Sequence, residues 1–236
     1  MPACSRPGCA TSGPTQCFLR VRSYDIWRRG YVEIVKYVWA VVAGYLLGAI
    51  PVGRIAGKTL KGVDVTEIGS GRIGATNVLR AAGVGAAAIT LVGDAAKGML
   101  ATIVGRLLGG TPLAAALAGS AAVIGHDCSV FLKWGGGVGT ITSLGATAML
   151  AGPVAGGLAA LGALVVGLSR YSSLGSMVIA ISLPIALLVS ALTTGSPAVY
   201  VVHGLIGGGV ALWALRPNIK RLLSGTERRI GDRVTV

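Results

Sequence analysis

Charged residues are scarce in this chain of 236 residues: they make up 12% of it, and only 8 are acidic. Soluble globular domains carry about a quarter charged residues, so this composition excludes an ordinary soluble domain. Aromatic residues are also few, at 5%, whereas 53% of the chain is hydrophobic and 38 residues are glycine. The hydrophobic residues form long blocks rather than alternating runs, and abundant glycine lets helices pack closely. The chain is therefore predicted to be an integral membrane protein made of helices.

Cysteine and histidine, the usual ligands of structural metals, are equally scarce, with 4 and 2 residues. Three of the cysteines, Cys4, Cys9 and Cys17, lie in the N-terminal extension, and the fourth is Cys128. Cys4 and Cys9 have no histidine near them, which makes a poor zinc signature. Neither a metal site nor a cofactor is predicted.

Basic residues outnumber acidic ones by 21 to 8, which gives a formal net charge of +13. Such a charge could serve nucleic-acid binding, but the lysines and arginines gather in short segments between the hydrophobic blocks and near the C-terminus. That distribution is the positive-inside pattern of membrane proteins, and contact with anionic lipid headgroups explains it further. Membrane lipids are therefore expected partners, and nucleic acid is not.

Seven hydrophobic blocks are predicted to cross the membrane. The fourth and fifth are short for a hydrocarbon core of about 30 Å, so one long helix across both is the competing interpretation. Seven spans place every basic segment on the cytoplasmic side, whereas six would send the basic C-terminal segment outside. The blocks are residues 34–53, 83–108, 112–132, 139–151, 153–168, 174–192 and 198–215.

The predicted fold class is thus all-α: a polytopic membrane protein with seven transmembrane helices and cytoplasmic motif loops. The transmembrane domain covers residues 34–216, and a cytoplasmic C-terminal segment covers residues 217–236. Residues 1–33 are polar and lack the hydrophobic core of a secretory signal, so they are predicted to be a disordered basic extension, which a mis-assigned start would explain. The N-terminus is expected outside and the C-terminus in the cytoplasm, although Arg28 and Arg29 run against that orientation.

The segment most typical of a binding site is residues 69–80, which follows the first hydrophobic block. Its glycines allow backbone N–H groups to approach an anion, Ser70 and Asn77 add polar contacts, and Arg80 supplies a bidentate cation. The glycine spacing formally matches a dinucleotide fingerprint, but no βαβ unit surrounds it. A tight turn between spans, or contact of Arg80 with lipid headgroups, is the plain alternative. The prediction is a phosphate site at the edge of the membrane.

A few polar residues elsewhere have two interpretations each. Asp94 and Lys97 lie one helical turn apart inside the second block, where a mutual ion pair and contact with a substrate are equally open. His126 ends the third block and is more often a cap or packing residue than a base, and His203 is expected to be structural. The glycine run at residues 135–139 is either a plain turn or a binding loop, and it lacks the Gly-Lys-Ser/Thr of an ATP-binding loop.

Several segments, taken in order over about residues 40–232, resemble the PlsY family, the acyl-phosphate:glycerol-3-phosphate acyltransferases. The first and last are the most specific, although Asn218 and Glu227 in the last could be plain helix-terminus residues. The resemblance is carried by residues 53–80 with Asp64, 93–98 with its Asp-x-x-Lys-Gly pattern, 125–126 with 131–140, 170–176 and 218–227.

The chain departs from the family pattern at several positions. The family's glycine loop carries two lysines, where this chain has Gly135 and Val138. A histidine that precedes the C-terminal asparagine is replaced by Leu215, and Asn and Pro of the first motif are replaced by Arg72 and Ile73. The changes at Gly135, Val138 and Leu215 remove two lysines and a histidine from the expected site.

The resemblance implies transfer of a fatty acyl group from acyl phosphate to the 1-hydroxyl of glycerol 3-phosphate, giving lysophosphatidic acid and phosphate, at a bacterial cell (inner) membrane. Phosphate is a good leaving group, so positioning and charge neutralisation supply much of the catalysis without a covalent nucleophile. The alternative is a catalytically impaired paralogue that binds acyl phosphate or lipid without turnover. Transport is less favoured because the blocks contain few polar residues.

For an active enzyme, the missing positive charge is expected from Lys133, Arg72 or Lys220. The implied catalytic residues are Ser70, Arg80 and Asn218, and the implied substrate-binding residues are Gly69, Gly71, Asn77, Lys133, Gly136, Gly137 and Gly139.

Overall fold

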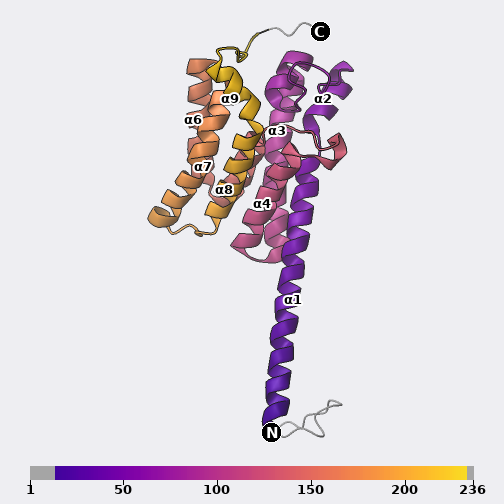
Figure 1. The fold of residues 1–236 in the computed structure, drawn as a ribbon, viewed down its shortest axis with the longest axis vertical. Coiled ribbons are helices and arrows are strands. Elements are labelled where there is room, and N and C mark those ends of the chain that lie inside the picture. The colour runs from indigo at the N-terminus through magenta and orange to yellow at the C-terminus, as the bar shows by residue number, and fades with distance from the viewer. Residues whose placement is uncertain (1–13, 233–236) are drawn as a thin grey trace.

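The structure, a computed structural model, describes residues 14–232, with side chains from residue 30 onward. Every regular element within residues 14–232 is a helix, which confirms the all-α prediction (Figure 1). In chain order these are α1 (Pro14–Ala49), α2 (Val52–Lys61), α3 (Ala75–Gly109), α4 (Pro112–Asp127), the 3-10 turn η1 (Val130–Leu132), α5 (Thr140–Leu150), α6 (Gly152–Ser169), α7 (Ser172–Thr194), α8 (Tyr200–Ala214) and α9 (Arg216–Leu223).

The helices of the bundle are suited to lipid surroundings. Five stretches of the described chain are long and apolar enough to cross a membrane, and α5 and α8 are shorter apolar helices. Large side chains such as Leu107, Leu168 and Leu192 are exposed on the outside of the bundle, which suits hydrocarbon rather than water. Together these elements provide the seven apolar helices that the sequence predicts. The five long stretches are residues 30–61, 75–109, 112–132, 152–169 and 172–194.

The fourth and fifth hydrophobic blocks form two helices rather than one. Ala151 has non-helical backbone angles, φ −152° and ψ 79°, and it separates α5 from α6. The competing interpretation of a single long helix is therefore wrong. With 11 residues, α5 is short, and at 1.5 Å per residue it rises only about 17 Å. The loop before α5 lies nearer the middle of the bundle than α2 and α9 do (Figure 1).

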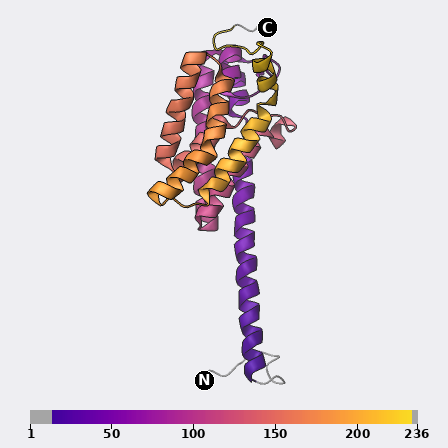
Figure 2. The same cartoon turned by 60° about the vertical axis from the view of Figure 1, so that its left-hand side comes forward.

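Several connections between helices lie at the two ends of the bundle. Figures 1 and 2 show α2, α9 and the C-terminal segment at one end, and the connection between α7 and α8 at the other. The short connection at residues 110–111, between α3 and α4, lies at that second end too. The first and last motif segments, which adjoin α2 and α9, therefore lie at one end of the bundle, while the glycine loop before α5 lies nearer its middle.

The first helix is longer than the block predicted for it. It begins at Pro14 and runs to Ala49, so residues 14–33, expected to be disordered, are helical in the structure. In both views this part of α1 projects well beyond the bundle (Figures 1 and 2). The remainder of the predicted extension, residues 1–13, lies outside the described residues.

Small residues allow the helix backbones to meet. A Cβ atom added at Gly48 of α1 would overlap the backbone of Ala122 in α4, and one added at Gly125 would overlap α1. The same holds between α3 and α5, where Gly98 faces Thr142 and Gly145 faces Ala95. Close backbone approach of this kind supplies packing energy in lipid, where burial of apolar side chains gives no advantage over contact with acyl chains.

Candidate functional site

A cavity of about 520 Å³ opens at the end of the bundle that carries α2 and α9. It is lined by the loop before α3, the first turns of α3, the end of α4, the loop before α5, the start of α7 and the segment from α9 onward. Seven of the residues that the sequence predicts for the site line this cavity: Gly69, Ser70, Asn77, Arg80, Gly137, Gly139 and Asn218. Gly71, Lys133 and Gly136, which were also predicted, do not line it.

The loop before α3 is held in shape by Asn77. The Nδ2 group of this buried side chain lies 2.9 Å from the carbonyl oxygen of Val65, 3.0 Å from that of Ile68 and 2.8 Å from that of Arg72. Its Oδ1 accepts a hydrogen bond of 3.1 Å from the backbone N–H of Ser70. Both N–H groups of the amide are thereby committed to the loop. Asn77 positions Ser70 and is not free to donate to a substrate.

The glycines of this loop serve its turns. Gly69 and Gly71 have φ values of 66° and 69°, in the left-handed region that glycine adopts without strain. A Cβ atom at Gly69 would also overlap Oδ1 of Asn77. Gly71 thus serves a tight turn, as the alternative to a phosphate site proposed. Gly69 also forms a turn, but it borders the cavity as well.

Outside the cavity, Asp64 ties this loop to α2. Arg54 donates from Nε at 3.0 Å and from Nη2 at 2.7 Å to Oδ2 of Asp64, and Lys58 Nζ lies 3.0 Å from the same oxygen. The hydrogen bonds from Arg54, together with one from Thr66, hold the pKa of Asp64 well below its usual range. Asp64 therefore remains ionised and anchors the loop.

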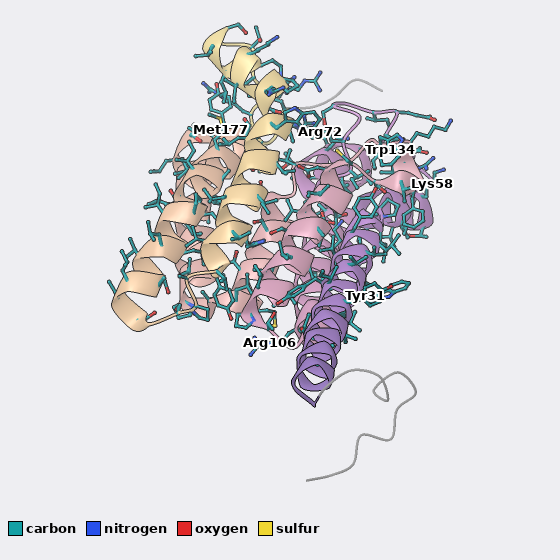
Figure 3. All side chains as sticks on the ribbon, turned by 60° about the horizontal axis from the view of Figure 1, so that its bottom comes forward. Tyr31, Lys58, Arg72, Arg106, Trp134 and Met177 are labelled. Atoms are coloured by element: carbon teal, nitrogen blue, oxygen red, sulfur yellow. The ribbon has the colours of Figure 1, made fainter. Side chains whose placement is uncertain are left out.

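Four arginines line the cavity, and two of them have unused donors. Arg72 donates from Nη2 to the carbonyl oxygen of Ala214, while its buried Nη1 has no partner among the described residues. Figure 3 shows Arg72 beside the α8–α9 end, apart from Lys58 and Trp134. Arg80 donates to the carbonyl oxygen of Arg229 at 3.1 Å, and its buried Nε likewise lacks a partner in the described part of the chain. The four are Arg72, Arg80, Arg221 and Arg228.

Burial lowers the pKa of the Arg72 guanidinium. An arginine starts from a pKa above about 12, so it stays cationic at neutral pH. The wall of the cavity therefore carries permanent positive charge, and the unpartnered N–H groups of Arg72 and Arg80 are buried in that wall. Guanidinium groups are typical ligands of phosphate.

Glu227 organises the opposite wall. Its carboxylate accepts hydrogen bonds from Asn218 Nδ2 at 2.7 Å, Ser173 Oγ at 2.8 Å and Arg221 Nε at 2.7 Å. Burial alone would raise the pKa of Glu227, but these three donors outweigh it and the pKa is lowered. The Oδ1 atom of Asn218 is buried without a partner among the described residues and remains able to accept. Sequence reasoning placed Asn218 in the site but missed Glu227, whose only signal was its spacing in the last motif.

The glycine loop at residues 135–139 packs against the end of α4. Gly137 donates its backbone N–H to the carbonyl oxygen of His126 at 3.0 Å, and a Cβ atom at Gly136 would overlap the backbone of His126 and Asp127. Gly139 has a φ of 67° and precedes the first turn of α5. Lys133, by contrast, is exposed in a left-handed turn at one end of this loop. The loop is thus a fitted part of the wall rather than a plain turn.

Three charged or titratable side chains inside the bundle belong to the same region. Lys97 Nζ lies 3.0 Å from Asp94 Oδ1 and 2.6 Å from His126 Nδ1. Asp94 and His126 line the cavity, although neither was predicted as a site residue. The signal in the sequence was the pair of charges within a hydrophobic block, which is a mark of function in a membrane. The two interpretations of Asp94 and Lys97 are therefore compatible, since the ion pair borders the cavity.

His203 lies elsewhere, in the interior of the bundle. Its ring contacts Ser120 Oγ at 3.2 Å and Ser143 Oγ at 3.4 Å, and it does not line the cavity. This agrees with the structural role expected for it. No cluster of three or more potential metal ligands occurs within the described residues.

The chain is similar to proteins of one family along most of its length. A family model described as glycerol-3-phosphate acyltransferase matches residues 38–225. A glycerol-3-phosphate acyltransferase from Rubrobacter xylanophilus is 45% identical over 196 residues, covering 83% of this chain and 96% of that protein. One from Thermus thermophilus is 40% identical over 197 residues, covering 84% of this chain and 96% of that protein.

Two crystal structures are similar in fold. Both are of PlsY (YgiH), described as an integral membrane glycerol 3-phosphate acyltransferase. The glycerol 3-phosphate form has a TM-score of 0.74 and 33% sequence identity, covering 83% of this chain and 96% of that chain. The lysophosphatidic acid form has a TM-score of 0.73 and the same identity, covering 83% of this chain and 95% of that chain.

Proposed function

The chain belongs to the glycerol-3-phosphate acyltransferase family, and from that membership we propose that its cavity transfers a fatty acyl group from acyl phosphate to glycerol 3-phosphate. The products are lysophosphatidic acid and inorganic phosphate. The observation that carries the proposal is the convergence of Ser70, Arg80, Asn218 and the glycine loop on one cavity of about 520 Å³. A shared site for two phosphorylated substrates needs donors from several loops, and this cavity provides them.

Arg72 is the cation that replaces the missing lysine of the glycine loop. Of the three candidates for that charge, Arg72 lines the cavity, whereas Lys133 and Lys220 do not. Val138, at the position of the absent lysine, lines the same cavity, so Arg72 and a lysine at that position would reach the same space. Because Arg72 can supply the positive charge of the missing lysine, an active enzyme is favoured over a paralogue that only binds its ligands.

In the reaction, the 1-hydroxyl oxygen of glycerol 3-phosphate attacks the carbonyl carbon of the acyl phosphate. The bond from that carbon to the phosphate oxygen breaks, and the leaving phosphate takes up the proton of the hydroxyl. Arg72 and Arg80 hold the phosphate groups, while Ser70 and Asn218 orient the glycerol. Positioning of this kind supplies most of the rate enhancement because the donor is already activated.

The cavity faces the cytoplasm of a bacterial cell, in the inner membrane, with the N-terminus outside. Its arginines lie at the end of the bundle that carries α9 and the basic residues of α2. Lysine and arginine gather on the cytoplasmic side of membrane proteins, which supports this orientation. The acyl chain would extend between the helices toward the lipid.

The test is an acyl-transfer assay with the purified protein in lipid vesicles. Palmitoyl phosphate and radiolabelled glycerol 3-phosphate should give labelled lysophosphatidic acid and an equal amount of inorganic phosphate, and a thioester donor should give none. A protein that binds palmitoyl phosphate but forms no product, under conditions where the Thermus thermophilus relative works, would be the impaired paralogue instead.

A further inference from the structure

A buried cluster of Asp94, Lys97 and His126 lies where the cavity reaches between α3 and α4. Asp94 is 2% exposed, Lys97 4% and His126 3%, yet Asp94 and His126 both border the cavity. Ionisable groups at this depth in a membrane protein are costly to keep, so their presence calls for a role beyond packing. The steps described above use none of the three.

The arrangement around Lys97 determines where the histidine ring carries its proton. The ammonium nitrogen lies 2.6 Å from His126 Nδ1, 3.0 Å from Asp94 Oδ1 and 3.2 Å from the carbonyl oxygen of Ile50. An ammonium group has three N–H donors and no acceptor, and three acceptor atoms surround it here. With Lys97 charged, Nδ1 of His126 accepts from it at 2.6 Å rather than donating to Asp94 Oδ1, which lies 3.5 Å from the same nitrogen. The ring hydrogen of the neutral imidazole then lies on Nε2.

The Nε2 atom points at the glycine loop. A Cβ atom added at Gly137 would overlap Nε2, so only glycine leaves room for the ring at this point. Nε2 makes no hydrogen bond to any described residue, while His126 borders the cavity beside Gly137 and Gly139. The ring of His126 is thus fixed against Gly137 at the wall of the cavity, and its Nε2 has no acceptor among the described residues.

We propose that the Nε2–H group of His126 donates a hydrogen bond to the carbonyl oxygen of the acyl phosphate and stabilises the negative charge that develops there. Lys97 and Asp94 act through His126 as positioning residues, because they hold the ring in the tautomer that can donate. The proposal rests on the acyl-transfer function and names the group that meets the reacting carbonyl.

The charges around the cavity favour a carbonyl over a phosphate at this place. The four arginines come from the loop before α3, the start of α3 and the segment from α9 onward. The cavity residues of α4 and the glycine loop include no cation, and the Asp94 carboxylate stands next to His126. Lys97 offsets the charge of Asp94 at 3.0 Å, so this part of the wall offers no net positive charge to a phosphate dianion, whereas a neutral carbonyl needs none. An acyl chain lying between the helices also brings its carbonyl to this inner part of the cavity.

The hydrogen bond requires no proton transfer. As the glycerol hydroxyl attacks, the carbonyl oxygen gains negative charge and the bond from Nε2–H strengthens. When the tetrahedral intermediate collapses, the bond between the carbonyl carbon and the phosphate oxygen breaks. The phosphate leaves with the proton of the hydroxyl. His126 ends the cycle as it began, neutral and protonated on Nε2, which suits a donor fixed in place before the reaction.

Nuclear magnetic resonance gives the first test, on the folded wild-type protein. The chain has only 2 histidines, so ¹⁵N-histidine labelling yields two rings, and the His203→Gln variant identifies that of His126. The expected spectrum shows His126 protonated on Nε2 and not on Nδ1. In Lys97→Met the ring should become a mixture of tautomers, whereas Lys97→Gln keeps an N–H donor toward Nδ1 and should preserve the wild-type state. A wild-type ring protonated on Nδ1 would overturn the proposal.

Kinetics with palmitoyl phosphate give the second test. Removing one donor to a developing oxyanion typically costs about 10²–10³-fold in kcat, and His126→Ala should show a loss of this size with little change in KM for glycerol 3-phosphate. His126→Gln retains an N–H group near the Nε2 position. Its kcat should therefore be at least about tenfold higher than that of His126→Ala. His203→Gln, at a buried histidine that does not line the cavity, should lower the melting temperature but leave kcat of the folded protein within about twofold of wild type.

The outcomes separate the two levels of the proposal. No product from the wild-type protein would reject the acyl-transfer function itself. An active wild type together with an unimpaired His126→Ala variant would reject only the role of His126. A raised KM for glycerol 3-phosphate with unchanged kcat would also reject it, because the ring would then bind the acceptor rather than the transition state.

Discussion

The guanidinium of Arg80, in the second turn of α3, donates a hydrogen bond of 3.1 Å to the carbonyl oxygen of Arg229, which lies 149 residues further along the chain. The segment that follows α9 is thereby fastened across the start of α3. A second hydrogen bond holds the same segment: the carbonyl oxygen of Arg170 accepts from the backbone N–H of Ile230 at 2.8 Å. The wall of the cavity that carries Glu227 and Arg228 depends on these contacts.

Arg80→Ala should therefore lose activity for two reasons, a missing cation and a loosened wall. Loss of a charged donor from a preorganised site costs about 10²–10³-fold, and we expect kcat/KM for glycerol 3-phosphate to fall by at least that factor. Arg80→Lys should retain part of the activity because it keeps the charge but not the fork of donors. Arg106→Ala provides the control, since Arg106 is an exposed arginine near the other end of the same helix.

Arg72 and Val138 should be exchangeable as carriers of one positive charge. Arg72→Asn removes the cation and should raise the KM for glycerol 3-phosphate by about tenfold or more, because a hydrogen bond to a charged group is worth about 1.5–3 kcal/mol. Adding Val138→Lys to that variant should recover most of the affinity. A double variant as weak as Arg72→Asn alone would show that the two positions do not serve the same phosphate.

Gly137→Ala should be far more harmful than alanine elsewhere in the bundle. The added Cβ atom would overlap the ring of His126, whereas at Gly156 of α6 it would meet nothing within 4 Å. Glycine to alanine in an open helix position is neutral or stabilising by up to about 1 kcal/mol. We expect Gly137→Ala to lower kcat at least about tenfold, by displacing the donor ring, and Gly156→Ala to leave activity and melting temperature unharmed.

Glu227 should make the stability of the C-terminal wall depend on pH. Its pKa in the folded protein lies below the ordinary value of 4.5, because Asn218, Ser173 and Arg221 donate to its ionised form. The stabilisation is therefore present above pH 4.5 and is lost as the pH falls through the folded pKa. Limited proteolysis of the segment after α9 should accelerate over that range. In Glu227→Gln, cleavage should be faster at neutral pH and nearly independent of pH.

The orientation in the membrane can be tested with single cysteines in a background without the four native ones. A cysteine at Ser224 should react with a membrane-impermeant reagent only from the cytoplasmic side, and a cysteine at Ser196 only from outside. These positions lie after α9 and between α7 and α8, at opposite ends of the bundle. Labelling of both from one side would reject the seven-span topology.

The sequence predicts the helices well because their cause is local. Blocks of apolar residues bounded by glycine and proline determine where a span begins and ends, and the pattern placed the break near residue 152 correctly. The convergence of the first and last motifs also followed from the sequence, since parity of the spans puts their loops at one end. Both inferences need only the order of elements along the chain.

The roles of single polar residues depend on contacts that the sequence does not contain. Asn77 resembled a ligand for phosphate, but its amide faces three backbone carbonyls of its own loop. Lys133 stands next to the glycine loop in the chain, yet its left-handed backbone at φ 51° belongs to a turn outside the cavity. His126 and Lys97 are 29 residues apart and meet only because α3 packs on α4. Such pairings arise from tertiary packing, which a single sequence does not reveal.

The bonds that Arg72 and Arg80 make to Ala214 and Arg229 also bear on how the protein matures. They join residues 142 and 149 positions apart, so the cavity closes only when the first and last spans are both inserted and packed. Contacts of such long range form late, after local helices and neighbouring pairs are in place. A molecule with one misinserted helix would have its arginines on opposite sides of the bilayer and no enclosed site. Enzymatic activity in this protein is therefore a direct report of complete and correctly oriented assembly, and incompletely inserted molecules should be unable to consume either substrate.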